Sequence, residues 1–230
     1  MTRWEVDGPT NKLLWKRLGK ASHLLLKNPG LSRVLDLGGG SGWFANKVRE
    51  KKPSVEVHSI DLSPEDRGDG VIHTKGDILN LPFDDEYFDG MTAHAVLHHV
   101  PDDIPRAVEE AYRVLKPGSF FVIEEPGGDN LIAKFARKFF PTEKHDPGER
   151  PLSINDMVGP IKKRFEILKV EHHFLMSYLC PHVVARVPKL LKRPARGCAK
   201  VLYRCDFFLL KYLPWTRRYC AYVLVVGRRY

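Results

Sequence analysis

A glycine-rich turn directly after an apolar run is the segment best suited to hold a ligand. The run 34–37 contains Asp36. The turn follows with four glycines: Gly38, Gly39, Gly40 and Gly42. Because glycine has no Cβ, the backbone can turn sharply here and come close to a bound molecule. A carboxylate beside such a turn can orient polar ligand groups. The segment predicts a small-molecule binding loop.

The spacing of the glycines separates this loop from two common nucleotide-binding patterns. A dinucleotide-binding turn needs G-x-G-x-x-G, but Trp43 occupies the third position, where helix and strand must pack closely. The sequence contains no G-x-x-x-x-G-K-[ST] loop either. The pattern through Gly42 is instead G-x-G-x-G.

Two further aspartates follow at the distances that a nucleoside ligand requires. Asp61 ends the next apolar run, about 20 residues beyond the glycines, where an acid accepts from both ribose hydroxyls. Asp77 lies between Gly76 and Ile78 in a short turn. The alternative for each of these acids is a structural role in capping a helix or a turn.

In this order the segments resemble the class I S-adenosylmethionine-dependent methyltransferases, in particular the group that includes quinone-biosynthesis and other small-molecule methyltransferases. The resemblance covers about residues 31–126. The matching segments are 36–42, 59–63, 76–78, 81–89, 97–100 and 113–118.

The resemblance implies S-adenosylmethionine as the cofactor and a role for each motif. Asp36 and the glycine turn would orient its methionine part, Asp61 its ribose, and Asp77 the amino group of its adenine. The remaining predicted cofactor contacts are Leu62, Ile78 and His94.

Methyl transfer from a sulfonium is an in-line displacement, so positioning supplies most of the catalysis, about 7–11 kcal/mol. A general base adds about 10²–10⁴-fold where the acceptor must lose a proton. The predicted bases are His98 and His99, together with His145 in the segment 141–147 of the first insertion, which we interpret as a substrate lid. The alternative for each is a structural histidine. Further candidates are His172 and His173.

Glu124 and Glu125 end the expected strand 119–124 on its ligand-facing side. Either they bind substrate or they cap the turn that follows.

Apolar runs alternating with helical patterns predict a Rossmann-like, doubly wound α/β fold with a seven-stranded, mostly parallel sheet and an antiparallel last strand. Lys116-Pro117-Gly118 is expected to be a turn. Helices are expected over 9–28, 43–52, 102–115 and 153–164. Strands are expected over 33–37, 55–60, 71–75, 88–95, 119–124, 166–174 and 219–226.

We expect one domain over 1–230, with a cofactor-binding core over 31–126 and helical cap insertions over 126–152 and 176–217. Each insertion has an apolar stripe beside basic residues, and we interpret both as caps whose stripes are buried. The alternative is a helix in a membrane interface. The stripes are Leu131, Ile132, Phe135, Ala136, Phe139 and Phe140, and Cys198, Val201, Leu202, Cys205, Phe208, Leu209, Tyr212 and Leu213.

The charge is unevenly distributed along the chain. The formal net charge is +9, but residues 1–150 carry 21 Lys and Arg against 24 Asp and Glu, and residues 151–230 carry 16 against 4. The basic part could meet phosphate, acidic lipid or nucleic acid. Nucleic acid is disfavoured, because the segment 93–99 lacks the Asn/Asp-Pro-Pro-aromatic motif of amino-methylating enzymes.

Composition limits the remaining classes. The chain is 43% hydrophobic and 28% charged, as in globular proteins. It has no apolar run of about 18 residues and no apolar N-terminal segment, so we expect a cytoplasmic protein with an option of peripheral contact at the inner membrane surface. The four cysteines lack zinc-site spacing, so no metal is expected.

The sequence thus predicts methyl transfer from S-adenosylmethionine to a small molecule, hydrophobic, anionic or lipid-linked. The alternatives are an RNA-modifying methyltransferase and a cofactor-binding scaffold without catalysis.

Overall fold

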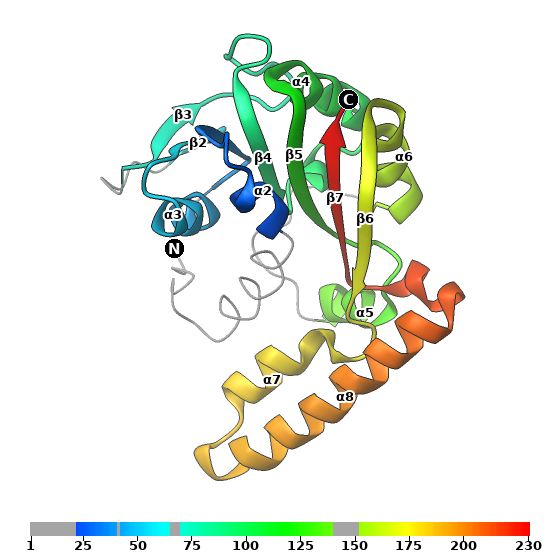
Figure 1. Cartoon of the computed structure of the whole chain (residues 1–230). Helices are drawn as coiled ribbons and strands as arrows, with labels where there is room; N and C mark the ends of the chain where they lie inside the picture. Colours follow the sequence, from blue (N-terminus) through cyan, green and yellow to red (C-terminus); the bar gives the residue numbers. More distant parts are fainter. Residues whose placement is uncertain (1–21, 41, 65–69, 140–151) are drawn as a thin grey trace.

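The computed structural model describes residues 22–40, 42–64, 70–139 and 152–230, and its centre is one seven-stranded sheet (Figure 1). The strand order is β3-β2-β1-β4-β5-β7-β6, with β7 antiparallel to both of its neighbours and the other pairs parallel. This confirms the predicted doubly wound α/β sheet. The strands are β1 (Arg33–Leu37), β2 (Glu56–Asp61), β3 (Ile72–Lys75), β4 (Phe88–His94), β5 (Leu115–Pro126), β6 (Phe165–His173) and β7 (Tyr222–Arg229).

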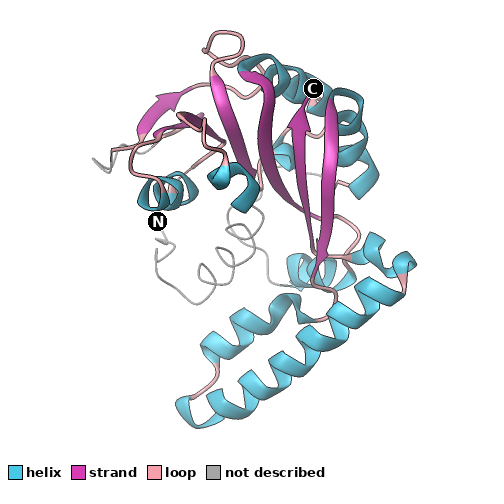
Figure 2. Ribbon diagram, viewed as in Figure 1, coloured by secondary structure: helices cyan, strands magenta, loops and turns pink. Residues whose placement is uncertain are grey.

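Helices cover both faces of this sheet (Figure 2). Alternate residues of β1 enter different cores: Leu35 packs in the core that includes α4 and α6, and Val34 in the core that includes α2 and α3. Burial on both faces explains why β1 reads as a continuous apolar run. The helices are α2 (His23–Lys27), α3 (Trp43–Lys51), α4 (Ile104–Val114), α5 (Leu131–Phe139), α6 (Ile154–Arg164), α7 (Cys180–Arg186) and α8 (Lys192–Tyr212).

Most strands differ from the sequence prediction by one to four residues at an end, β7 for example being Tyr222–Arg229 and not 219–226, and two of these differences have a local reason. β4 ends at His94 and not at 95, because Ala95 adopts a φ of 55°, which breaks the extended conformation. β5 begins at Leu115 and not at 119, so Lys116-Pro117-Gly118 lies within a strand. The pairing of β4 with β5 shifts register between Phe88 and Gly90, which accommodates this irregular segment.

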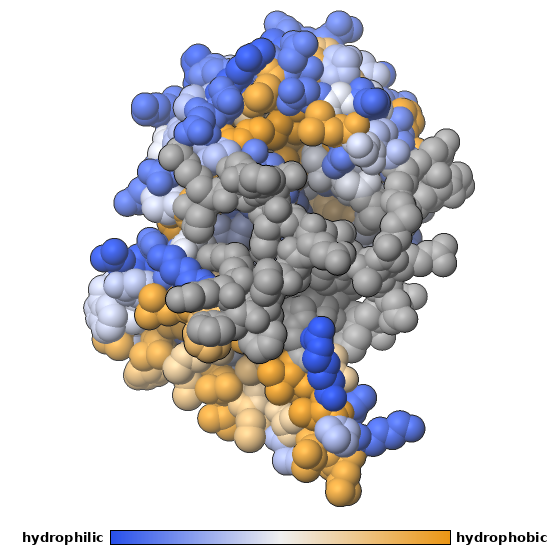
Figure 3. All heavy atoms as spheres, turned by 180° about the vertical axis from the view of Figure 1, so that it is seen from behind, coloured by the Kyte–Doolittle hydropathy of each residue, from blue (hydrophilic) through white to orange (hydrophobic). Residues whose placement is uncertain are grey.

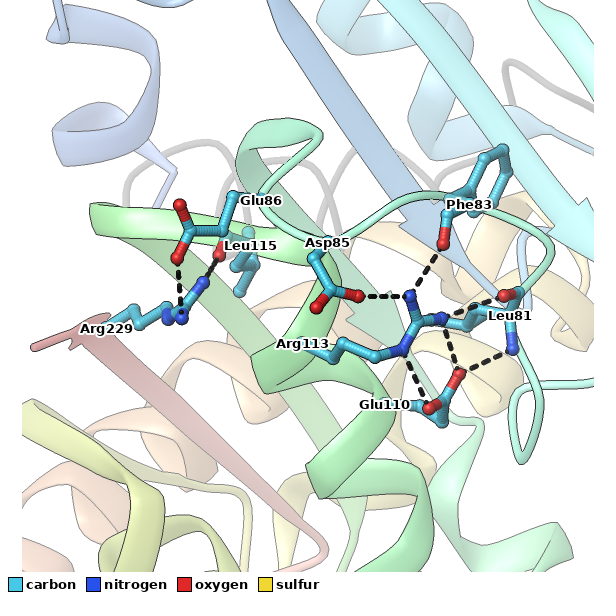
Figure 4. Close-up of polar contacts among 8 residues, drawn as sticks. All are labelled: Leu81, Phe83, Asp85, Glu86, Glu110, Arg113, Leu115 and Arg229. Atoms are coloured by element: carbon cyan, nitrogen blue, oxygen red, sulfur yellow. Dashed lines mark hydrogen bonds and ion pairs between the residues drawn. The ribbon is translucent and has the colours of Figure 1, made fainter.

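A network around Arg113 fastens the loop before β4 to helix α4 (Figure 4). Its guanidinium donates to the carbonyl oxygens of Leu81 (2.9 Å) and Phe83 (2.7 Å). It also pairs with Glu110 on the same helix and with Asp85 of the loop. The two sequence segments 81–89 and 113–118 therefore form one structural unit. A shallow hollow beside it lies at the amino ends of the parallel strands, and its lining includes Glu86, Tyr112 and Arg229.

The segment between β6 and β7 forms two packed helices, α7 and α8, joined and flanked by the short 3-10 helices η2 (Ser177–Leu179), η3 (Lys189–Leu191) and η4 (Pro214–Tyr219). We call residues 176–219 the hairpin. It projects beyond the sheet (Figure 1).

The prediction that the hairpin's apolar stripe is buried is wrong. Val201, Phe208 and Tyr212 are exposed, as are Cys198 and Cys205. The buried face of α8 is instead formed by Ala199, Asp206 and Leu210. In α5, Leu131 and Phe135 are exposed as well, and only Ala133 of the side chains described there is buried.

Most of the predicted N-terminal helix, residues 9–21, lies outside the described residues, and α2 is the part observed. Among the residues that the structure describes, no helix has the length and apolar character needed to cross a membrane.

Candidate cofactor and acceptor site

The glycine turn connects β1 to α3 through three left-handed residues. Gly38, Gly40 and Gly42 have φ values of 61°, 51° and 68°, and Gly42 is the N-cap of α3. Side chains rarely adopt this conformation, so the turn requires glycine at these positions. The turn lies at the carboxyl end of β1, where open α/β sheets bind their ligands.

The four glycines differ in what a side chain would meet. A Cβ on Gly38 would lie 2.6 Å from the side chain of Val96, and one on Gly39 would lie 2.1 Å from the Ser59 hydroxyl. At Gly42 it would meet His73 at 2.7 Å. At Gly40, however, the nearest atom is Oδ2 of Asp61, 3.9 Å away. Internal packing therefore accounts for three of the glycines, while Gly40 borders open space beside a carboxylate.

Asp36 is buried behind the turn and holds its two sides together. Its carboxylate accepts from the Ala45 N–H of α3 (3.2 Å) and from the Thr92 hydroxyl of β4 (3.0 Å). Burial raises the pKa of Asp36 from 3.8 to about 6, against the lowering effect of these hydrogen bonds. These contacts give Asp36 a structural role in positioning the turn.

Asp61 ends β2 next to the open side of Gly40. Its Oδ2 accepts from the Gly40 N–H (2.9 Å), and its Oδ1 accepts from the Ser63 N–H (3.0 Å). An ionised carboxylate has about four acceptor positions, so each oxygen keeps one for a further donor. The adjacent Leu62 is exposed. Asp61 can therefore accept from two hydroxyl groups of a ligand.

Asp77 and Ile78 lie in the turn after β3. The Asp77 Oδ1 accepts from the Leu79 N–H (2.9 Å), the local turn contact that the sequence left as the alternative for this residue. Asp77 is exposed, so its carboxylate is accessible to a ligand. Ile78 is buried in the core, with a small exposed fraction.

Glu125 holds the segment after β4 in place. This buried carboxylate accepts from the N–H groups of Val96 and Leu97 with Oε1, both at 2.7 Å. Its Oε2 lies 2.9 Å from Nδ1 of His98. Since a carboxylate accepts, Nδ1 carries the proton and Nε2 of the neutral ring is left as the basic nitrogen. Of the two roles that the sequence left open for Glu125, capping the turn is the one its contacts support.

The same contacts position His98 on a segment that packs against the glycine turn. His98 lies two residues beyond Val96, whose side chain packs against Gly38. Its ring is partly buried, and the ring of His99 lies 4.2 Å away with its side chain exposed. The segment that carries His98 therefore packs against the glycine turn through Val96.

A second histidine–glutamate pair lies at the same ends of β4 and β5. His94 ends β4, and its Nδ1 lies 3.0 Å from Oε2 of Glu124, which is fully buried. The ring of His94 is stacked at 6.4 Å on Tyr222, the first residue of β7. Two carboxylates and two imidazoles thus line the ends of β4 and β5.

Of the other predicted histidines, the structure describes His172 and His173, which lie on β6. His145 lies outside the described residues. His172 lies on β6 opposite Val223, and burial, with nearby Arg217, lowers its pKa to about 4. His173 forms a pair with Glu171 at 3.3 Å. Within the described ranges, no cluster of three or more histidines, cysteines and acids could hold a metal ion.

Thr92 and Val96 are contacts that sequence reasoning missed. Thr92 fixes Asp36, and Val96 packs on the turn. Only the register between β1 and β4, which pairs Asp36 with Thr92, reveals the first contact.

Residues 35–123 match the family model described as a methyltransferase domain. Demethylmenaquinone methyltransferase of Thermus thermophilus is 35% identical to this chain over 123 residues, 49% of this chain and 54% of that protein. The 2-phytyl-1,4-naphtoquinone methyltransferase of Nostoc punctiforme is 53% identical over 99 residues, 37% of this chain and 43% of that protein. The chain spans about half the length of the curated relatives it matches.

A solved S-adenosylmethionine-dependent methyltransferase of Archaeoglobus fulgidus superposes with a TM-score of 0.63 and 19% identity, covering 95% of this chain and 94% of that one. This similarity extends to the whole fold, including strands beyond the family match. Residues 35–123 are thus similar to a methyltransferase domain, and the chain shares the fold of a solved S-adenosylmethionine-dependent methyltransferase.

Proposed function

We propose that this chain transfers a methyl group from S-adenosylmethionine to a small hydrophobic acceptor, of the quinone or lipid-linked type, with His98 as the general base. The observation that carries the proposal is that three groups follow the carboxyl ends of neighbouring parallel strands, at one edge of the sheet. They are the open backbone at Gly40, the carboxylate of Asp61 and the imidazole of His98.

The proposed cofactor contacts follow from the free acceptors and open space of the site. Asp61 would accept from the two ribose hydroxyls, since each of its oxygens keeps an acceptor position. Asp77 would accept from the adenine amino group, with Ile78 and Leu62 beside the ring. The glycine turn, positioned by Asp36, and His94 would border the methionine part.

When bound, S-adenosylmethionine supplies an electrophilic methyl group on a sulfonium. His98 would take the proton that the acceptor loses, on Nε2, while Glu125 holds the ring through Nδ1. Glu125 also stabilises the imidazolium that results, because its charge lies 2.9 Å from the ring. His99 and His145 remain secondary candidates for this role.

The acceptor class is supported by the relatives and by the apolar surface of the molecule. Several of the matched relatives are named for demethylmenaquinone or 2-phytyl-1,4-naphtoquinone, while others are named for a malonyl-[acyl-carrier protein] or a tRNA. Apolar side chains, among them Leu131 and Phe135 of α5, are exposed after the carboxyl end of β5. A ring with a long apolar tail fits such surroundings better than a polar metabolite.

Calorimetry tests the cofactor part of the proposal. The purified chain is titrated with S-adenosylmethionine and S-adenosylhomocysteine. Asp61→Asn should weaken the affinity for both ligands by at least about tenfold, because hydrogen bonds to a charged group contribute about 1.5–3 kcal/mol each. Asp84→Asn is the matched control, because Asp84 is an exposed aspartate in the loop before β4, at the opposite edge of the sheet. Equal affinity of the Asp61 variant and the wild type would contradict the assignment.

Tritium transfer from the cofactor to a reduced demethylnaphthoquinone with a short prenyl tail tests the reaction. Tight cofactor binding without transfer to any hydrophobic acceptor would favour the scaffold alternative. Transfer to tRNA in its place would favour the RNA-modifying one.

A further inference from the structure

The outer face of helix α8 carries an apolar stripe without a partner in the described structure. Val201, Phe208 and Tyr212 are 58%, 58% and 56% exposed, and with Cys205 they recur every three or four residues. Leu190, at the turn between α7 and α8, is 88% exposed, and Trp215 after α8 is 67% exposed. Figure 3 shows apolar residues gathered over this end of the molecule. Exposed apolar surface of this extent marks a binding surface.

A basic stripe runs along α8 beside the apolar one. Arg193, Lys200, Arg204 and Lys211 are all exposed, and they recur at intervals of seven, four and seven residues. The hairpin as a whole, residues 176–219, contains ten Lys and Arg and a single acid, Asp206. An amphipathic helix with basic residues beside its apolar face is typical of helices that lie in a membrane interface.

Asp206 does not offset this charge at the surface, because it is buried and turned inward. It accepts from the N–H groups of Leu175, Met176 and Ser177 at 2.8–3.0 Å and from the Ser177 hydroxyl at 2.5 Å. These bonds fix the start of the hairpin against α8. The outer face of the hairpin therefore carries basic residues beside the apolar stripe, and the one acid of the hairpin does not offset them.

The hairpin begins and ends at the edge of the sheet that carries the candidate site. Tyr222, where β7 begins, pairs with Pro126 at the end of β5 and with His173 at the end of β6. Asn130, after β5, donates to the carbonyl oxygens of Leu175 (3.1 Å) and Tyr219 (2.8 Å), one on each side of the hairpin. Any partner that binds the hairpin would therefore lie near the candidate site.

We propose that the outer face of the hairpin docks the protein onto a bilayer that contains anionic lipids. The stripe of Val201, Phe208 and Tyr212 enters the interface, and the adjacent basic stripe pairs with lipid phosphates. The docking concerns the lipid surface and does not depend on the proposed reaction, so each can be tested without the other.

The charge disfavours the two other occupants of this face. A second copy would bring two sets of ten basic residues together with no surface acid between them, which like-charge repulsion opposes. A nucleic acid would satisfy the charges, but it would leave Leu190 and Val201, which are aliphatic, without a suitable contact.

Vesicle flotation of the full chain tests the docking. Vesicles of phosphatidylcholine alone are compared with vesicles that also contain phosphatidylglycerol, at low and high salt. Lys200→Glu with Arg204→Glu should weaken binding to the anionic vesicles by at least about tenfold, because each basic residue near such a surface contributes about 1 kcal/mol. The matched control is Lys162→Glu with Lys163→Glu, which makes the same change of charge at exposed positions of α6.

Phe208→Ser tests the contribution of the apolar stripe to vesicle binding. This variant should bind the vesicles more weakly than the wild type even at low salt. Circular dichroism and the melting temperature verify that each variant is folded. Binding that requires phosphatidylglycerol, falls with salt and is lost only in the hairpin variants supports the proposal. Absence of binding, equal binding to both vesicle types, a dimer in solution that the α8 variants dissociate, or RNA binding at high salt that vesicles do not displace would overturn it.

Discussion

Asp36 is a motif residue whose main contacts are internal. Its position before the glycines suggested a ligand contact, whereas its carboxylate is used to join α3 and β4. Burying an ionised carboxylate is unfavourable, and this desolvation raises the pKa of Asp36 to about 6. Spacing identified the residue, but its role depends on the register of β1 with β4, which a single sequence does not contain.

The raised pKa predicts how stability depends on pH. Because the folded state holds the Asp36 proton more tightly, this group's contribution is fully present below pH 3.8 and is lost as the pH rises through about 6. The shift corresponds to about 3 kcal/mol. Asp36→Asn should remove the loss, so the variant should gain up to that amount relative to the wild type as the pH rises through this window.

Urea unfolding at a series of pH values, without cofactor, measures the difference between the two proteins. His172, whose pKa is lowered to about 4, loses stability in the opposite direction as the pH falls, but it is present in both proteins and cancels in the difference. A difference that does not change with pH would show that the pKa of Asp36 is the same in the folded and the unfolded state, and would contradict the raised value.

Glu125 and His98 allow a sharper test of the proposed base. Glu125→Gln keeps one oxygen for the N–H groups of Val96 and Leu97, but its amide cannot accept from His98. The proton of the neutral ring should therefore move to Nε2. We expect a loss in kcat of about 10²-fold with little change in KM for the cofactor.

Nitrogen NMR of the His98 ring measures which ring nitrogen carries the proton. If Glu125 had only a structural role, its replacement would not change this tautomer. His99→Gln is the control, since the His99 side chain is exposed and should contribute little. If kcat falls fully in the His99 variant and not at all in the Glu125 variant, the base is His99 and the assignment to His98 is wrong.

Strands that read as continuous apolar runs were predictable from sequence. Segments whose conformation depends on pairing with a strand distant in sequence were not. β4 was expected over 88–95 and observed as Phe88–His94, because its residues are buried on both faces and read as one apolar run. Lys116-Pro117-Gly118 has the composition of a turn, yet pairing with β4 continues the strand around it. Local propensity was overruled there by the neighbouring strand.

The hairpin shows the same limit for helices. The spacing of Val201, Phe208 and Tyr212 correctly indicated an amphipathic helix. Periodicity does not specify what the apolar face contacts, and the structure leaves this one exposed. The helix was therefore predictable, but its orientation was not.

At the scale of the whole molecule, the basic surface and the candidate site lie in different parts of the chain. The basic residues of the C-terminal third are concentrated in the hairpin, while the candidate site is built from Asp36, Asp61, Glu124 and Glu125. The sequence predicted the charge asymmetry but not that both regions share one edge of the sheet. That arrangement would let a membrane-bound acceptor reach the site without leaving the lipid surface.

This arrangement predicts a difference between acceptors presented in vesicles and in solution. Lys200→Glu with Arg204→Glu should slow methyl transfer to an acceptor embedded in anionic vesicles by about tenfold, in proportion to lost docking. Transfer to a short-tailed, water-soluble acceptor should be unchanged, because both residues lie on the exposed face of α8. Rates with the two acceptors, measured with the wild type, this variant and the α6 control, give the comparison. If the soluble acceptor is slowed equally, the hairpin belongs to the active site and not to a separate docking surface.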